Sequence, residues 1–224
     1  MTTPKTSFTA WSYSRWHDWY LCPRKAKYKF LDGRKEPPNQ AMERGSQIHK
    51  DAEQYIVGNK TTNPFEEFGT FKRELDKLKK RPDVVAEAQW TFTEDWAQTG
   101  WRDDDAWLRM GIDAHFPLPK AKELVIVDFK TGKVREENLT QLGLYALGAF
   151  MREPSIAKVH LEFWYLDAGT DQYVFYDREE LEELKAAWEK RAADMFADRI
   201  FPTRPGPRCR FCFYRKSNGG PCEF

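Results

Sequence analysis

The sequence predicts an α/β protein in which helices flank a central mixed β-sheet. Between residues 84 and 176, three strand-like segments are followed by one helical segment and then by two more strand-like segments. A helix between two strands acts as a crossover, and the helical segments before and after this block can cover the sheet. The length of 224 residues fits one domain, residues 1–224, with a helical N-terminal segment and a cysteine-rich C-terminal tail.

The first third of the chain is predicted to be helical. Ser12–Ser14 can cap a helix with aromatic residues at helical spacing, and Pro23 opens a basic continuation. A long helix is expected from Gln40 to Val57, and another is expected to start at Asn63–Pro64. The latter would bury apolar residues spaced by three and four positions, namely Phe65, Phe68, Phe71, Leu75 and Leu78.

Five strands are predicted from alternating or continuous apolar runs, at residues 84–92, 108–116, 124–130, 158–166 and 172–176. A helix at Thr140–Arg152 separates the third strand from the fourth. Asp177 and Glu180 then form a capping box for a final helix that reaches the region of Ile200.

Composition excludes several classes of protein. Aromatic residues make up 15% of the chain, which argues against disorder, and the net charge of +1 means that affinity for nucleic acid must come from local patches. No apolar run approaches the ~20 residues of a membrane helix, and the opening residues lack a secretory signal. We therefore expect a cytoplasmic protein without a membrane partner. Its four cysteines favour metal ligation over disulfides in that reducing compartment.

The stretch VIVDFKTGK, residues 125–133, carries an aspartate and a lysine at the end of a buried strand. Side chains alternate along a strand, so Asp128 and Lys130 share one face. Glu87 and Asp113 also fall on polar faces of predicted strands. A cluster of carboxylates needs cations or exposure to water, and Mg²⁺ and Mn²⁺ prefer oxygen ligands. The alternative is that each acid faces solvent, which has most weight for Glu87.

Several short motifs together resemble the core of PD-(D/E)XK nucleases, in which Asp113, Asp128 and Lys130 match the family's acidic residues and lysine. More narrowly, the chain is similar to the RecB nuclease-domain family, including the iron–sulfur CRISPR-adaptation nucleases and their phage relatives. RGSQIH supplies Gly45 and His49 for the family's Gly-x-x-x-His element, and QLGLYA supplies Gln141 and Tyr145. SYSRWHDWYLCPRKAKYKF matches the family's opening segment. The resemblance implies a restriction-endonuclease-like core.

The resemblance also implies roles for these residues. His49, Asp113 and Asp128 would ligate Mg²⁺ or Mn²⁺, and Glu87 would serve a second ion or a water. Lys130 would act near the attacking water. Gln141 and Tyr145 lie four residues apart on one helical face, so both can look toward the site and contact DNA or Lys130. Ordinary helix packing is the alternative for His49 and for Tyr145.

The four cysteines form a second candidate metal site. Cys209, Cys212 and Cys222 lie in the tail, and Cys22 is the only other cysteine. A C-x-x-C pair brings two thiolates to one metal, and structural zinc suits four cysteines. The family resemblance implies instead that Cys22 completes a [4Fe–4S] cluster. Four unligated buried cysteines are the remaining alternative.

These observations favour a metal-dependent deoxyribonuclease, an exonuclease that acts on DNA ends or single strands. Basic residues interleaved with aromatics follow Cys22 and surround the tail cysteines, an arrangement that can bind unpaired strands. Two alternatives come from other classes: a non-catalytic DNA-binding or adaptation subunit that keeps the fold, and a zinc-stabilised scaffold for protein partners. The sequence leaves the oligomeric state and the direction of cleavage open.

Overall fold

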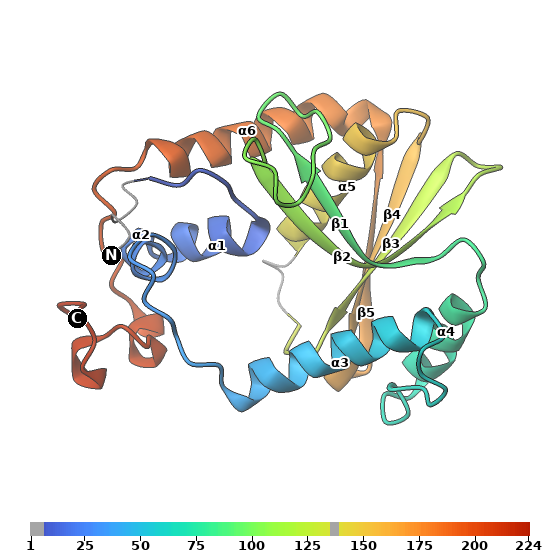
Figure 1. Ribbon diagram of the computed structural model, residues 1–224, viewed down its shortest axis with the longest axis horizontal. Helices are drawn as coiled ribbons and strands as arrows, with labels where there is room; N and C mark the ends of the chain where they lie inside the picture. Colours follow the sequence, from blue (N-terminus) through green and yellow to red (C-terminus); the bar gives the residue numbers. More distant parts are fainter. Residues whose placement is uncertain (1–6, 135–138) are drawn as a thin grey trace. The chain divides into compact units, whose positions relative to one another are not determined.

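The central element of the computed structural model, which describes residues 7–134 and 139–224, is a five-stranded sheet (Figure 1). Its strands follow one another in sequence order: β1 (Val85–Phe92), β2 (Leu108–Leu118), β3 (Glu123–Lys130), β4 (Lys158–Tyr165) and β5 (Thr170–Asp177). All neighbouring strands are antiparallel except β3 and β4, which are parallel and connected through α5 (Leu139–Arg152). The prediction of an α/β fold with a mixed sheet is confirmed.

Helices cover both faces of this sheet. α3 (Gln40–Ile56) and α4 (Thr70–Lys79) lie on one side, and α5 lies on the other (Figure 1). Val127 and Phe129 belong to the apolar cluster formed with α3 and α4. Because side chains alternate along a strand, Asp128 points to the opposite side, where it meets α5. Burial of β3 on both faces explains why its sequence is a continuous apolar run.

The helix expected to start at Asn63 begins only at Thr70, so that boundary was predicted wrongly. Gly69 has φ +55°, which interrupts the helical path, and the preceding residues form turns. The Asn63 side chain accepts a hydrogen bond from the Phe65 N–H at 2.7 Å and donates one to Lys72 O at 2.9 Å. Phe65 is nevertheless fully buried, so the predicted apolar spacing identified core residues even where the helix is absent.

β2 leaves its neighbour β3 at one point near the middle of its length. Pairing between them runs from Leu118↔Glu123 to Ala114↔Val127 and stops there, whereas β2 stays paired with β1 as far as Phe92↔Leu108. The divergence leaves Asp113 and Asp128 at a fork between the two strands. A fork of this kind gives side chains from a neighbouring helix access to the strand ends.

The chain divides into two compact units. The sheet unit is Pro38–Lys185, and the tail unit combines the residues up to Pro37 with Ala186–Phe224. The tail unit contains α1 (Tyr13–Leu21), α2 (Pro23–Ala26), a π-helical turn at Lys27–Leu31, the greater part of α6 (Leu181–Ala197) and 3-10 turns at Pro207–Phe211 and Lys216–Asn218. Further 3-10 turns in the sheet unit are Leu166–Ala168 and Arg178–Glu180.

Aromatic stacking and one partly buried acid organise the tail unit. The rings of Trp11 and Trp188 stack with centroids 5.7 Å apart. Asp18 receives hydrogen bonds from Lys25 at 2.9 Å and Lys29 at 2.7 Å. The predicted helix cap and the predicted capping box are both present: Ser12 Oγ accepts from the Arg15 N–H, and the Asp177–Glu180 box precedes α6. Within the two described ranges, none of the helices has the length and apolar character to cross a lipid bilayer.

Candidate active site

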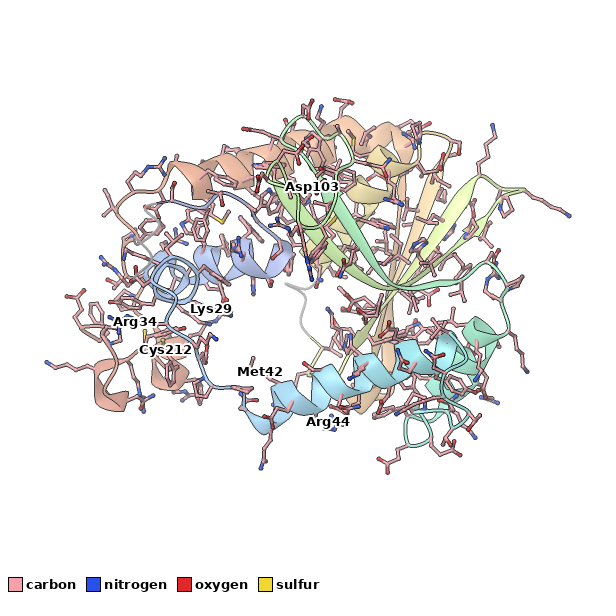
Figure 2. All side chains as sticks on the ribbon, viewed as in Figure 1. Lys29, Arg34, Met42, Arg44, Asp103 and Cys212 are labelled. Carbon is pink, nitrogen blue, oxygen red and sulfur yellow. The ribbon has the colours of Figure 1, made fainter. Side chains whose placement is uncertain are left out.

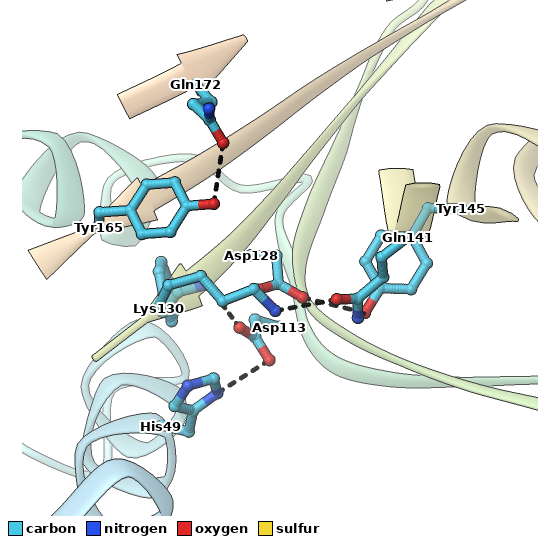
Figure 3. A network of polar contacts seen from close by, with 9 residues as sticks. His49, Asp113, Asp128, Lys130, Gln141, Tyr145, Tyr165 and Gln172 are labelled. Atoms are coloured by element: carbon cyan, nitrogen blue, oxygen red, sulfur yellow. Dashed lines mark hydrogen bonds and ion pairs between the residues drawn. The ribbon is translucent and has the colours of Figure 1, made fainter. Parts of the chain in front are cut away.

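Asp113 lies at the fork between β2 and β3 and uses both of its carboxylate oxygens. Oδ2 accepts a hydrogen bond from the Phe129 N–H at 2.6 Å, and Oδ1 lies 3.0 Å from Nδ1 of His49 on α3 (Figure 3). The first contact is available because Phe129 lies beyond the last pairing between the two strands. The fork therefore fixes Asp113 between the strand that follows it and the helix that covers it.

Three potential ligand atoms converge beside this contact. One nitrogen of His49 and one carboxylate oxygen each from Glu87 and Asp113 all lie within 4.8 Å of one another. They line an open pocket of about 380 Å³. The pocket is lined by Gly45, Ser46, His49, Lys50, Glu53, Glu87 and Asp113. An imidazole nitrogen with two carboxylates is a donor set that suits a divalent cation such as Mn²⁺ or Mg²⁺.

Glu87 reaches this pocket through an unusual backbone conformation. Its φ of +48° lies in the left-handed region, which a residue with a Cβ adopts at a cost of roughly 1–3 kcal/mol. Its side chain reaches solvent, but the pocket wall partly desolvates the carboxyl group, and this effect together with the charge of Asp113 raises the pKa of Glu87 to about 7. A cation bound between these carboxylates would remove that repulsion.

A second group of side chains forms a closed ring of polar contacts around the end of β3 (Figure 3). The Lys130 ammonium donates to Gln141 Oε1 at 3.1 Å, and the Gln141 amide donates to the Tyr145 hydroxyl at 2.5 Å. The Tyr145 hydroxyl donates to Asp128 Oδ1 at 2.9 Å. The Lys130 Nζ closes the ring, because it lies 2.6 Å from Asp128 Oδ2. The ring of contacts thereby fixes the side chains at the end of β3 against those of α5.

Asp128 is the most deeply buried acid of the site, with 3% of its surface exposed. Burial raises the pKa of Asp128, and the Lys130 ammonium opposes that shift. Oδ2 makes the ion pair with Lys130 at 2.6 Å. Burial also raises the pKa of Tyr145 well above its usual value, and Asp128 adds to the shift, so the hydroxyl remains a donor.

Opposing effects act on the pKa of His49. Burial lowers the pKa of His49, but the hydrogen bond and charge of Asp113, together with Asp128 and Glu87, more than offset burial and raise the pKa overall. The neighbouring carboxylates therefore favour protonation of His49 more than water does. A metal ion would compete with that proton for the ring nitrogen.

The structure brings the sequence-predicted residues into two adjoining groups rather than one. His49, Asp113 and Glu87 form the compact group of ligand atoms, whereas Asp128 belongs to the ring with Lys130. Asp113 joins the groups through the backbone of Phe129. The predicted metal ligands were His49, Asp113 and Asp128, so the geometry gives Glu87 a closer relation to His49 than expected. The roles of all these side chains remain predictions.

Three pocket residues were missed by the sequence analysis. Ser46, Lys50 and Glu53 line the pocket from α3. Ser46 lies three residues before His49, and Glu53 lies four residues after it. Helical spacing therefore places Ser46, His49 and Glu53 on one face of α3. That spacing could have identified Ser46 and Glu53. Glu53 also contributes to the raised pKa of Glu87.

The four cysteines all lie in the tail unit, and none forms a disulfide. The Cys212 N–H donates to Cys209 O at 3.0 Å, which makes the C-x-x-C segment a tight turn. Burial raises the pKa of the Cys212 thiol, and the nearby thiols of Cys222 and Cys22 act in the same direction. Cys212 is labelled in Figure 2. The thiol of Cys212 therefore lies within electrostatic range of both Cys22 and Cys222, and all three residues are partly open to solvent.

A forked mixed sheet that carries an Asp, an Asp-x-Lys pair and a candidate metal pocket is the arrangement of a metal-dependent nuclease. The sequence model of the PD-(D/E)XK nuclease superfamily matches residues 10–217, and the chain belongs to this superfamily. Among solved structures, the one described as "Crystal structure of SSO0001" is similar over 100% of this chain and 90% of that chain, with 14% identity and a TM-score of 0.46. No curated protein matches the sequence.

Proposed function

We propose that this protein is a Mg²⁺- or Mn²⁺-dependent deoxyribonuclease that hydrolyses phosphodiester bonds at DNA ends or in single strands. The observation that carries the proposal is the fork between β2 and β3, where the His49–Glu87–Asp113 pocket adjoins the Asp128–Lys130 pair. Membership of the nuclease superfamily supports a nucleic-acid substrate. The choice of DNA, and of ends over internal sites, rests on the resemblance to RecB-like nucleases.

The residues of the pocket fit a divalent cation. His49, Glu87 and Asp113 would hold it, because their ligand atoms already converge and the two carboxylates lack a full counter-charge. A bound divalent cation supplies a more acidic water and a positive charge for the phosphate oxygens. The raised pKa of Glu87 supports this assignment, because partial burial and the charge of Asp113 both disfavour its carboxylate form, and a bound cation would oppose both effects.

Lys130 and Asp128 act on the reacting groups in this proposal. The Lys130 ammonium can donate hydrogen bonds to an attacking water or to a phosphate oxygen, which stabilises charge that develops in the transition state. Asp128 holds Lys130 at 2.6 Å, and the Tyr145 hydroxyl fixes the other oxygen of Asp128. Gln141 orients both Lys130 and Tyr145, so it serves as a positioning residue.

The tail unit is assigned a structural metal cluster. Cys22, Cys209, Cys212 and Cys222 would ligate [4Fe–4S], with zinc as the competing metal for four thiolates. Their common location in one unit, with Cys22 and Cys222 near enough to Cys212 to affect its pKa, supports a shared site, although among the described residues only His49, Glu87 and Asp113 form a compact group of ligand atoms. The superfamily match spans residues from both units, which supports a single nuclease domain over residues 1–224. The reducing cytoplasm, the location expected from the sequence, would keep these cysteines available as metal ligands.

One assay tests the proposed activity directly. Purified protein is incubated with end-labelled linear DNA or with covalently closed circular DNA, and with Mg²⁺, Mn²⁺ or a chelator. The expected result is release of nucleotides from linear DNA only, with either metal and not with the chelator. Cleavage of both forms would replace the exonuclease by an endonuclease. Binding without cleavage under every condition would favour the non-catalytic DNA-binding subunit.

A further inference from the structure

Two aromatic rings in the tail unit are exposed to water, and the less exposed one, Phe213, also packs edge-to-face against Tyr214 with ring centroids 5.2 Å apart. Phe211 has 75% of its surface exposed and Phe213 has 38%. They flank Cys212: Phe211 is the last residue of the 3-10 turn at Pro207–Phe211, and Phe213 lies two residues beyond it. Single exposed apolar residues are common on protein surfaces, but two neighbouring aromatic rings in a basic segment form a recognisable binding surface.

The backbone that carries these rings is anchored. Tyr214, which follows Phe213, has only 1% of its surface exposed, and its hydroxyl donates to Arg34 O at 2.7 Å. The Cys222 N–H donates to Tyr214 O at 2.9 Å. A Cβ at Gly220 would lie 2.3 Å from Tyr214 backbone atoms, so only glycine allows this close approach. The rings are therefore presented on an ordered loop, which lowers the entropic cost of binding.

Positive charge is concentrated around the same rings. Residues 201–224 contain five basic side chains, Arg204, Arg208, Arg210, Arg215 and Lys216, and one acidic side chain, Glu223. Five minus one gives a net charge of +4 for this segment, against +1 for the whole chain. The Arg210 guanidinium lies over the Phe211 ring, 4.5 Å from its centroid. A ligand for this segment must combine negative charge with flat apolar groups.

We propose that residues 209–216 form a binding surface for an unpaired nucleic-acid strand, in which Phe211 stacks on a base and Arg210 contacts the phosphates. The proposal rests on the proposed nuclease function and adds a site for the substrate strand. A single strand fits because its bases are free to stack on a protein ring, whereas the bases of a duplex already stack on each other. Residues 209–216 place basic side chains at positions 210, 215 and 216 and exposed rings at 211 and 213, so one short loop offers contacts for both phosphates and bases.

The decisive test measures coupling between the Phe211 ring and a base. Binding of a short oligothymidylate is compared with binding of an abasic oligonucleotide that has the same number of phosphates, without added divalent ion. Phe211→Ala should weaken oligothymidylate binding by about 5- to 150-fold, the loss expected for one stacking interaction. It should leave binding of the abasic strand unchanged. Equal loss with both ligands, or no loss with either, would overturn the proposal.

Matched variants separate stacking from other effects. Ile200→Ala removes an aliphatic side chain that is 79% exposed in the same unit, and it should not change binding. Phe211→Tyr should retain binding and Phe211→Leu should not, and full binding by Phe211→Leu would contradict base stacking. Metal content is measured for each variant. A loss of metal in Phe211→Leu that accounts for its weaker binding would assign the ring to shielding the cysteines instead.

Arg210→Ala should weaken binding of both oligonucleotides alike. The slope of log Kd against log salt concentration should fall by about 0.7, the value for one phosphate contact on a single strand. Binding and cleavage are scored separately, so the two proposals can fail independently. If wild-type protein degrades DNA but Phe211→Ala binds both oligonucleotides as well as wild type does, only the proposed binding surface is wrong. If Phe211→Ala loses oligothymidylate binding selectively but wild-type protein cleaves no DNA, only the nuclease assignment is wrong.

Discussion

The Lys130 ammonium lies 2.6 Å from Oδ2 of Asp128, and that ion pair is held inside the protein at the end of β3. The side chain of Asp128 is only 5% exposed, and that of Lys130 is 24% exposed. Removing one member of a buried pair leaves the other charge without a partner. The pair therefore links the stability of the strand end to the chemistry proposed for Lys130.

Lys130→Ala should reduce DNA cleavage by about 100- to 1000-fold, the usual effect of removing one group that stabilises transition-state charge. DNA binding should persist, because binding rests on phosphate contacts elsewhere. Cleavage rates and oligonucleotide Kd values are measured on protein whose circular dichroism spectrum matches the wild type. Lys133→Ala, on the loop after β3, serves as the control and should keep its activity. Undiminished metal-dependent cleavage by Lys130→Ala would remove Lys130 from the active site.

Gly45 allows α3 to approach the loop after β3. A Cβ at this position would lie 2.9 Å from Thr131 Oγ1, although alanine in a helix interior normally stabilises a protein by roughly 0.5–1 kcal/mol. Gly45→Ala should therefore fail to stabilise the protein and should lower activity, because α3 carries His49 one turn later. Thermal unfolding and cleavage rates check both effects.

The double variant Gly45→Ala/Thr131→Ala provides the control for that argument, since it removes the atom that the new Cβ would meet. Its activity should recover toward that of Thr131→Ala alone. Gly111→Ala, where a Cβ would meet nothing within 4 Å, should show no comparable steric effect. If the activity of the double variant does not recover, the effect of Gly45→Ala does not come from a clash with Thr131.

The fold could be predicted from the sequence because local patterns determine it. Continuous apolar residues indicated that β3 is a buried strand, and the helix between β3 and β4 indicated a crossover; the structure shows that β3 is buried along its middle and that the two strands are parallel. The start of α4 was missed because it depends on a left-handed backbone conformation at Gly69, which an apolar spacing does not reveal. The alternation of side chains along a strand was enough to predict that Asp128 and Lys130 lie on the same face of β3.

The contacts between distant segments could not be derived in the same way. The His49–Asp113 contact depends on the point where β2 leaves β3, and no local pattern marks that point. The approach of Glu87 to the same pocket depends on its φ of +48°, and alternation in the strand sequence gives no sign of it. Residue types and motif order indicated these positions, but the geometry that groups Glu87 with His49 came from the structure.

His49→Ala should weaken Mn²⁺ binding and cleavage while changing the unfolding temperature of the metal-free protein little. The His49 side chain is 29% exposed and contributes one polar contact to Asp113, so its loss leaves no large cavity. Titration calorimetry with Mn²⁺ and thermal unfolding measure the two quantities. His49→Gln keeps a polar side chain and serves as a comparison. A large loss of stability with normal Mn²⁺ affinity would identify His49 as a packing residue.

Asp18 should make the stability of the protein depend on pH in the acid range. Burial raises the pKa of Asp18, but its hydrogen bonds and ion pairs with Lys29 and Lys25 more than offset burial, so the pKa lies below its usual value. A depressed pKa contributes stability that is present above the unfolded-state pKa of about 3.8 and is lost as pH falls through the folded-state pKa.

Asp18→Asn should therefore lower the free energy of unfolding by about 1–2 kcal/mol near neutral pH, less than for fully buried partners because both lysines retain some solvent. The difference between wild type and variant should shrink as the pH falls below about 4. Denaturant unfolding at a series of pH values measures it. A difference that stays constant across that range would mean that the charge of Asp18 does not contribute.

Ligation by the four cysteines would join Cys22, near the start of the chain, to three residues near its end. On the chain-entropy model for covalent links, closing a loop of more than ~100 residues is worth about 5 kcal/mol, so metal binding should be coupled to folding. Protein purified without oxygen should be brown and should contain about four irons per chain.

Cys22→Ser should bleach that colour and lower the unfolding temperature, and any loss of cleavage should follow from the lost stability. Elemental analysis and the absorption spectrum measure the metal, and calorimetry measures the unfolding. The comparison that isolates the metal uses wild-type protein stripped of it, which should unfold at the same temperature as Cys22→Ser. One zinc and no iron in wild-type protein would replace the cluster by a zinc site. Iron retained at full content in Cys22→Ser would show that Cys22 is not a ligand.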